Sequence, residues 1–169
     1  QENIFQLKAN ENIVEPLFPN VKGNPQYWTN KMIQLTVEQN DTDYMYSFSS
    51  IKGKYYRQKD SVSKVYGQNQ IVYVSVMNQN GVISQEREVV LSNLDLFQPK
   101  VNVNFKEINS YVIFSVDASD DLSGVKEYSF DGGKTYQTSN QYIVKDNKEV
   151  SIYVKDYAGN IKKKKKTYS

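Results

Sequence analysis

Hydrophobic and polar residues alternate with a period of two along most of this 169-residue chain. The pattern is clearest in VKEYSF (residues 125–130) and VSIYV (residues 150–154), which are rich in aromatic and β-branched side chains. Such alternation is typical of half-buried β-strands. Similar segments lie at 18–21, 31–38, 43–49, 62–66, 71–77, 82–90, 101–105, 111–116 and 142–144, and a last strand starts at Ile161. The sequence therefore predicts an all-β chain.

Glycine-containing turns separate the predicted strands. Asp131-Gly132-Gly133 follows one of them, and we expect a tight hairpin-type turn there because only glycine adopts positive φ without steric cost. Residues 156–159 form a second turn, which contains Asp and Gly, before the strand at Ile161. Hairpins joined by an excursion across a sheet are typical of β-sandwiches.

The second half of the chain repeats the first. The matching positions are Tyr46-Ser47-Phe48 with Tyr128-Ser129-Phe130, Gly53-Lys54 and Tyr56 with Gly133-Lys134 and Tyr136, Val76, Asn78, Gly81 and Ile83 with Val154, Asp156, Gly159 and Ile161, Ile33, Leu35 and Val37 with Val112, Phe114 and Val116, and Leu17-Phe18 with Leu96-Phe97. The offset drifts only at small insertions in turns, such as DDLSG in the second copy, where length changes are tolerated. A repeat of this kind predicts two like units. We assign 17–95 to a first β-sandwich, 96–169 to a second, and 1–16 to a linker or the tail of a preceding domain.

The segments SGVKEYSFDGGKTY and YVKDYAGNIKK resemble the bacterial immunoglobulin-like domains that are repeated in surface and secreted proteins of Gram-positive bacteria. PNVKGNPQYWTNKMIQLTV resembles the opening strands of the same family. The resemblance covers nearly the whole chain after residue 16 and implies two tandem immunoglobulin-like antiparallel β-sandwiches. It also implies a secreted or cell-surface location and neighbouring domains in a longer chain. Members of this family serve as spacers, adhesive modules and appendages to enzymes.

The chain contains no cysteine and no histidine. Without these residues, thiolate and Ser-His-Asp catalysis, the usual zinc sites and haem ligation are excluded. A glycosidase would need a pair of carboxylates in a cleft, and no pair stands out among the acidic residues. We therefore expect no enzyme, no catalytic residues and no cofactor.

Charge and hydropathy narrow the partners further. The net charge is +2, but without Lys162–Lys166 the 16 remaining basic residues face 19 acidic ones. A nucleic-acid-binding domain spreads its basic residues over one face with aromatic residues between them. This chain does not show that pattern, so we expect it to bind no nucleic acid. No apolar run is long enough to span a bilayer, so we expect no membrane insertion. If the protein is exported, as the resemblance implies, we expect a basic-then-apolar leader to have been removed or to lie upstream of Gln1.

The lysine run at 162–166 allows two interpretations. A cationic cluster attracts anionic wall polymers or membrane headgroups. However, the run aligns with the predicted strand at 83–90 of the first copy, and lysines along a terminal strand protect its unpaired edge against aggregation. We favour the edge-strand interpretation.

Two further features suggest ligands. The acidic segment Asp117-Ala118-Ser119-Asp120-Asp121 offers oxygen ligands for calcium, but it lacks the spacing of an EF-hand, and these residues are also common in turns. We predict no metal there. Aromatic residues near turns are candidates for stacking on sugars or contacting a protein: Tyr27, Trp28, Tyr55, Tyr56, Tyr136 and Tyr157.

Two other points concern links within the chain. An intramolecular Lys–Asn isopeptide bond occurs in some surface immunoglobulin-like domains, but no residue spacing here is diagnostic of one.

The connection 93–99 carries Leu94, Leu96 and Phe97 instead of the Gly and Ser of a free linker. We expect these three side chains to dock against a domain end.

The predicted function is that of a non-catalytic tandem module of an exported bacterial protein, acting as a surface spacer or adhesive region. Its partner would be a cell-envelope or host protein or glycan. The alternatives are a carbohydrate-binding accessory module of a secreted glycan-degrading enzyme and the structural subunit of a surface fibre.

Overall fold

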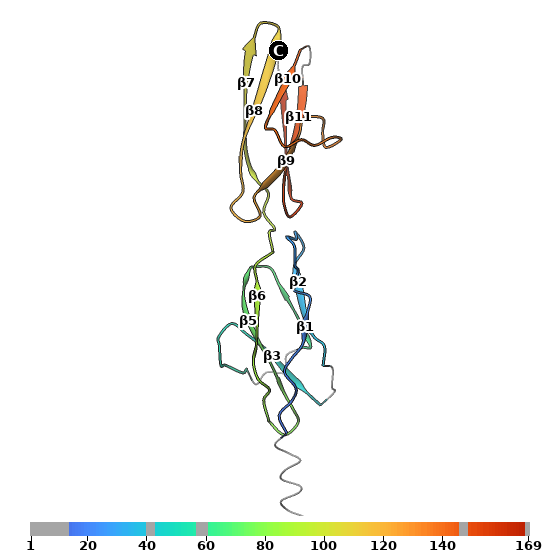
Figure 1. Ribbon diagram of the computed structural model, residues 1–169, viewed down its shortest axis with the longest axis vertical. Helices are drawn as coiled ribbons and strands as arrows, with labels where there is room; N and C mark the ends of the chain where they lie inside the picture. The colour runs from blue at the N-terminus through green and yellow to red at the C-terminus, as the bar shows by residue number, and fades with distance from the viewer. Residues whose placement is uncertain (1–13, 40–42, 57–60, 146–148, 168–169) are drawn as a thin grey trace, which may run out of the picture. The chain divides into compact units, whose positions relative to one another are not determined.

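A computed structural model of the chain describes residues 14–39, 43–56, 61–145 and 149–167 (Figure 1). Within these residues it is all-β, with no helix and four small antiparallel sheets. The chain divides into two compact units. Unit 1 comprises the described residues up to Gln26 together with Met32–Ser92, and unit 2 comprises Tyr27–Lys31 together with the described residues from Asn93 onward.

Unit 1 contains two three-stranded sheets, ordered β1-β2-β4 and β3-β5-β6. The strands are β1 (Val21–Lys22), β2 (Ile33–Val37), β3 (Met45–Ser49), β4 (Ser63–Tyr66), β5 (Gln70–Met77) and β6 (Arg87–Leu91). The core follows from the alternation in the sequence, because every second residue of a strand lies on the same face. In β2 the buried residues are Ile33, Leu35 and Val37, while Gln34 is exposed.

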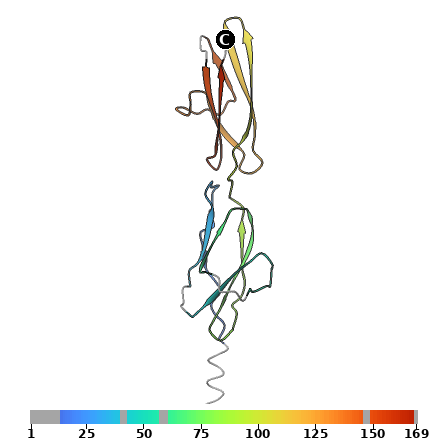
Figure 2. The same ribbon diagram turned by 180° about the vertical axis from the view of Figure 1, so that it is seen from behind.

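Unit 2 also contains two three-stranded sheets, ordered β7-β8-β10 and β9-β11-β12. The strands are β7 (Lys100–Ile108), β8 (Tyr111–Ser119), β9 (Val125–Ser129), β10 (Gln141–Val144), β11 (Glu149–Asp156) and β12 (Ile161–Thr167). In Figure 2 the yellow to orange strands β7 and β8 and the red strands β11 and β12 lie in two layers.

One hydrophobic cluster joins the two sheets of unit 2. It contains Val112, Phe114 and Val116 from β8 together with Ile152 and Val154 from β11. All are nearly inaccessible to solvent, and burying one such side chain stabilises a fold by about 1.5–3 kcal/mol. The packing of one sheet face on the other fits a β-sandwich.

The strand order is the same in both units. The first, second and fourth strands of each unit form one sheet, and the third, fifth and sixth form the other. The register agrees as well at the positions that matter below: Leu35 of β2 lies opposite Lys64 of β4, and Phe114 of β8 lies opposite Tyr142 of β10.

Several strand boundaries differ from the sequence prediction. The first strand is only two residues long and begins at Val21, three residues later than expected. The segment predicted as a strand from 82 to 90 forms β6 only from Arg87, while Ile83 makes an isolated bridge with Met77. A serine interrupts the ladder here, because the Ser84 hydroxyl accepts a hydrogen bond from the backbone N–H of Val76.

The turn after β9 is wider than predicted. Gly132 and Gly133 do have positive φ angles, of 74° and 89°. However, the loop is closed by the pair Tyr128 and Gln137, which exchange two backbone hydrogen bonds of 2.8 Å. The chain then crosses to the other sheet, where β10 pairs with β8.

The connection between the two sets of strands also differs from expectation. Thr29 bridges Leu94 and accepts a backbone hydrogen bond from Asp95, so that the segment around Thr29 belongs to unit 2 and not to the first domain. Leu94 is buried, as predicted, but Leu96 is 38% and Phe97 71% exposed. No helix in the described residues is long and apolar enough to cross a membrane.

Candidate functional sites

The six aromatic residues selected from the sequence do not form one site. Tyr55 and Tyr56 belong to unit 1, and the other four belong to unit 2. Tyr27 is 81%, Tyr157 57% and Tyr56 36% exposed. Trp28, Tyr55 and Tyr136 are half-buried.

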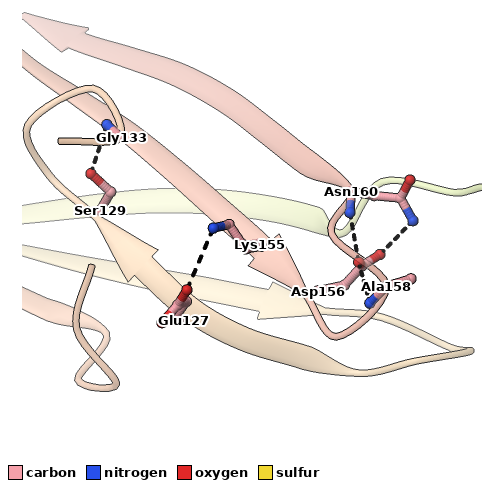
Figure 3. Close-up of polar contacts among 7 residues, drawn as sticks. All are labelled: Glu127, Ser129, Gly133, Lys155, Asp156, Ala158 and Asn160. Atoms are coloured by element: carbon pink, nitrogen blue, oxygen red, sulfur yellow. Dashed lines mark hydrogen bonds and ion pairs between the residues drawn. The ribbon is translucent and has the colours of Figure 1, made fainter. Parts of the chain in front are cut away.

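Tyr136 takes part in a cation–π contact on the outer face of unit 2. The Nζ atom of Lys155 lies 4.0 Å from the centroid of the Tyr136 ring. The same atom lies 3.5 Å from Glu127 Oε1, in the ion pair drawn in Figure 3. Burial raises the pKa of the Tyr136 hydroxyl, and the Glu127 charge adds to the effect. The Tyr136 side chain, from the connection between β9 and β10, is therefore engaged with side chains of β11 and β9.

Tyr56 lines a cleft in unit 1. The cleft has a volume of about 670 Å³ and lies beside β4, with walls that include Phe48, Tyr66 and Lys64. Pockets of 300–1,000 Å³ are typical of small-ligand sites. The amide side chains of Gln68 and Gln70 add polar groups to the wall.

Three carboxylates meet at one end of unit 2, in loops that are far apart in the sequence. Asp95 precedes β7, Asp120 follows β8, and Asp156 ends β11. One oxygen from each lies within 4.8 Å of the others. Asp95 and Asp156 are fully buried, and Asp120 is half-buried.

The Asp156 carboxylate holds the turn between β11 and β12 (Figure 3). Its Oδ1 accepts hydrogen bonds from the backbone N–H groups of Ala158 (3.0 Å) and Asn160 (2.8 Å). Its Oδ2 accepts one from the Asn160 side-chain amide at 2.9 Å. The same amide donates to the Asp95 carbonyl at 2.7 Å, which ties the turn to the segment before β7.

The other two carboxylates are also satisfied by nearby donors. Asp95 Oδ2 accepts from the hydroxyl (2.6 Å) and the N–H (3.0 Å) of Ser123, and its Oδ1 accepts from Phe97 N–H. Asp120 Oδ1 accepts from the N–H groups of Leu122 and Gly124. The cluster therefore acts as a clasp that joins three loops through backbone donors.

The shared site moves the pKa values of two carboxyls in opposite directions. Burial raises the pKa of Asp156, and the charges of Asp95 and Asp120 add to this effect against the hydrogen bonds from Asn160. Burial also acts to raise the pKa of Asp95, but hydrogen bonds from Ser123 and from Phe97 N–H outweigh it, so that this pKa is lowered. The cluster thus favours an ionised Asp95 beside an Asp156 that binds a proton more readily than an exposed aspartate does.

Oxygen ligands of this kind also suit a divalent cation such as calcium. The acidic segment 117–121 contributes only Asp120 to the cluster, and Asp117 and Asp121 are exposed. Sequence reasoning missed Asp95 and interpreted Asp156 only as a turn residue, because the three acids are adjacent in space and not in sequence. The only signal in the sequence was the combination of DDLSG with DYAGN, which occurs in the second copy alone.

The lysine run forms β12, which lies at the edge of its sheet as predicted. Lys162, Lys164 and Lys166 lie opposite Val154, Ile152 and Val150, and therefore on the core side of the strand. Charged side chains that point inward along an edge strand prevent pairing with another chain.

The outward lysines of β12 face neighbours on β11. Lys163 lies 5.0 Å from the centroid of the Tyr153 ring. Lys165 lies 3.8 Å from Glu149, with both side chains more than half exposed, so that this ion pair contributes little to stability. The arrangement supports the edge-strand interpretation.

A comparison with protein-family models finds no match, and a comparison with curated protein sequences finds no similar protein.

Proposed function

We propose that the chain is a non-catalytic tandem immunoglobulin-like module of an exported bacterial protein, and that it serves as a surface spacer or adhesive region. The observation that carries this proposal is the common strand order of the two units, with the first, second and fourth strands in one sheet and the third, fifth and sixth in the other. In immunoglobulin domains strands A, B and E share one sheet and strands C, F and G share the other. The order found here corresponds to that arrangement without strand D.

The side-chain chemistry supports a non-catalytic role. The chain has neither cysteine nor histidine. The carboxylates of Asp95, Asp120 and Asp156 accept hydrogen bonds from the backbone of their own loops, so that their oxygens hold the fold together. Binding would then use the loops and exposed faces, which carry the variable residues in folds of this kind.

A second candidate function is a carbohydrate-binding accessory module of a secreted glycan-degrading enzyme. The cleft beside Tyr56 favours it, because the cleft combines tyrosine side chains with amide groups. The gene that encodes the chain separates the two candidates, since a catalytic domain in the same gene supports the accessory module and a wall-anchoring segment supports the spacer.

The proposed location is tested on intact cells of the source bacterium. We expect an antibody raised against the chain to label unpermeabilised cells, and we expect mild protease treatment of those cells to remove the label while a cytoplasmic marker is retained. Labelling that appears only after lysis would overturn the proposal.

A further inference from the structure

The cleft in unit 1 lies where the two units differ in one pair of facing side chains. In unit 2, Tyr142 of β10 stacks on Phe130, with ring centroids 4.9 Å apart and planes 8° from parallel. Phe130 follows β9, which belongs to the opposite sheet. The stacked pair therefore joins the two sheets along this side of the sandwich.

The equivalent positions in unit 1 are Phe48 and Lys64. Phe48 lies in β3 within Tyr46-Ser47-Phe48, the counterpart of Tyr128-Ser129-Phe130. Lys64 lies opposite Leu35 in the same way that Tyr142 lies opposite Phe114. Directly opposed residues of an antiparallel pair share one face of the sheet, so Lys64 is on the same face as the buried Leu35.

A lysine at this position cannot form the stacked pair that a tyrosine forms. Lys64 and Tyr142 are both exposed although each lies on the core face of its sheet, so the difference lies in what they contact. Tyr142 stacks on Phe130, whereas Phe48 and Lys64 both line the cleft of about 670 Å³. Its Nζ lies 5.9 Å from the centroid of the Tyr66 ring. Where unit 2 has a stacked aromatic pair, unit 1 therefore has an open cleft with a positive charge on its wall.

The chemistry of the cleft defines the class of ligand. Lys64 carries the only formal charge among the described residues that line it, so an anionic group is favoured. A second cation, Lys54, contacts a residue of the lining, with its Nζ 5.1 Å from the centroid of the Tyr56 ring. Gln68 and Gln70 offer amide donors and acceptors, which suit hydroxyl groups, and Tyr56 offers an aromatic face.

We propose that the cleft of unit 1 binds an acidic saccharide, with its anionic group at Lys64 and its hydroxyl groups at the amides of Gln68 and Gln70. Tyr56 would contact the apolar face of the sugar ring. The inference rests on the proposed function, because it names the ligand class and the site that an adhesive module would use. It goes further in assigning binding to unit 1 alone, where the stacked aromatic pair is missing.

The test uses the full chain on an array of oligosaccharides that end in glucose, glucuronic acid, sialic acid or sulfated galactose, followed by titration calorimetry with the best acidic probe and its neutral counterpart. We expect acidic probes to bind and the neutral counterpart to bind more weakly. Lys64→Gln should weaken binding of the acidic probe roughly tenfold or more, because it removes a charge-assisted hydrogen bond. Lys22→Gln, a change of equal charge at an exposed position of β1, should leave binding unchanged.

Lys64→Tyr provides the decisive variant, since it restores the residue found in unit 2. We expect it to abolish binding while the chain keeps its fold, with an amide NMR spectrum that changes only near the cleft. Equal binding of acidic and neutral probes, binding by Lys64→Tyr as strong as that of the native chain, or no binding on the array would each overturn the inference. The proposed function is tested separately, by surface labelling of intact cells. If the cells are labelled but the saccharide test gives one of these three negative results, only the saccharide site is rejected.

Discussion

The turn between β5 and β6 in unit 1 and the turn between β11 and β12 in unit 2 have the same backbone and different chemistry. In unit 1, Asn78 Oδ1 accepts from the N–H groups of Asn80 (2.9 Å) and Val82 (3.0 Å). In unit 2, Asp156 Oδ1 accepts from the N–H groups of Ala158 and Asn160. The local turn therefore requires one side-chain oxygen at this position and does not require a charge.

The two turns differ in what the other polar atom of the side chain contacts, Nδ2 in Asn78 and Oδ2 in Asp156. Asn78 Nδ2 donates to the Val14 carbonyl at 3.1 Å, in a half-exposed position. Asp156 Oδ2 accepts from Asn160 in a fully buried position beside Asp95. The comparison shows that one turn design is used as an exposed cap in unit 1 and as part of a buried carboxylate clasp in unit 2.

Removal of the two side chains should have unequal effects. Asp156→Ala leaves two backbone N–H groups and the Asn160 amide without this acceptor in a buried site, and it should lower the free energy of unfolding of unit 2 by about 3 kcal/mol. In Asn78→Ala the backbone N–H groups of Asn80 and Val82 lose the same acceptor but can bond to water instead. This change should lower the free energy of unfolding of unit 1 by about 1 kcal/mol. Hydrogen exchange followed by mass spectrometry resolves the two units. Equal losses would show that burial of the clasp does not matter.

Replacement of the glycine in either turn should destabilise the two units by similar amounts, in contrast to replacement of Asn78 and Asp156. Gly81 and Gly159 have φ angles of 80° and 95°, which L-residues adopt only with strain. A Cβ atom at Gly81 would meet nothing within 4 Å, and one at Gly159 would lie 3.6 Å from Asn30 Nδ2, which is an ordinary contact. Alanine should therefore cost each unit a similar amount, about 1–2 kcal/mol. A much larger cost at Gly159, measured by the same exchange method, would mean that the turn of unit 2 is constrained by its neighbours.

These two turns also show how far the sequence could be used. The match of Asn78 and Gly81 with Asp156 and Gly159 predicted equivalent turns, because backbone geometry depends on local residue types. The alternation of Ile33, Leu35 and Val37 likewise predicted a buried strand face. Local patterns were therefore sufficient for the strands.

The functional features depended on contacts between distant segments. The sequence did not show that Asp95 and Asp156 would meet, since 60 residues separate them. The cleft was equally hidden, because the pairing of Lys64 with Leu35 and its correspondence to Tyr142 follow only from the register of the sheets. Of the six aromatic residues chosen from turn positions, Tyr56 lies at this cleft.

The pH dependence of stability should distinguish the units. Because the pKa of Asp156 is raised in the folded state, the folded chain binds a proton at this carboxyl more tightly than the unfolded chain does. The resulting gain in the free energy of unfolding is present at low pH and is lost as the pH rises above 3.8 through the raised pKa. The lowered pKa of Asp95 acts in the opposite sense and removes stability as the pH falls below 3.8. Asp156→Asn should abolish the loss on the alkaline side, as followed by hydrogen exchange of unit 2 between pH 3 and pH 7. Asn78→Asp, the reciprocal change, is the control: unit 1 should be destabilised by the carboxylate placed against the Val14 carbonyl.

The smallest effect is expected at a second carboxylate that unit 2 has and unit 1 lacks. Asp131 corresponds to Ser49, and its pKa is lowered to about 2 because the hydroxyl and the N–H of Thr135 donate to it at 2.6 Å and 2.9 Å. Thr135→Val removes the hydroxyl and should raise the pKa of Asp131 toward 3.8, as measured by NMR titration of the side-chain carboxyl. The stability of the folded chain at neutral pH should scarcely change, since Asp131 is exposed and its charge is screened by water. An unaltered pKa in this variant would mean that the Thr135 N–H and the Ser129 hydroxyl, which donates to Asp131 Oδ1 at 2.8 Å, are enough to hold the carboxylate.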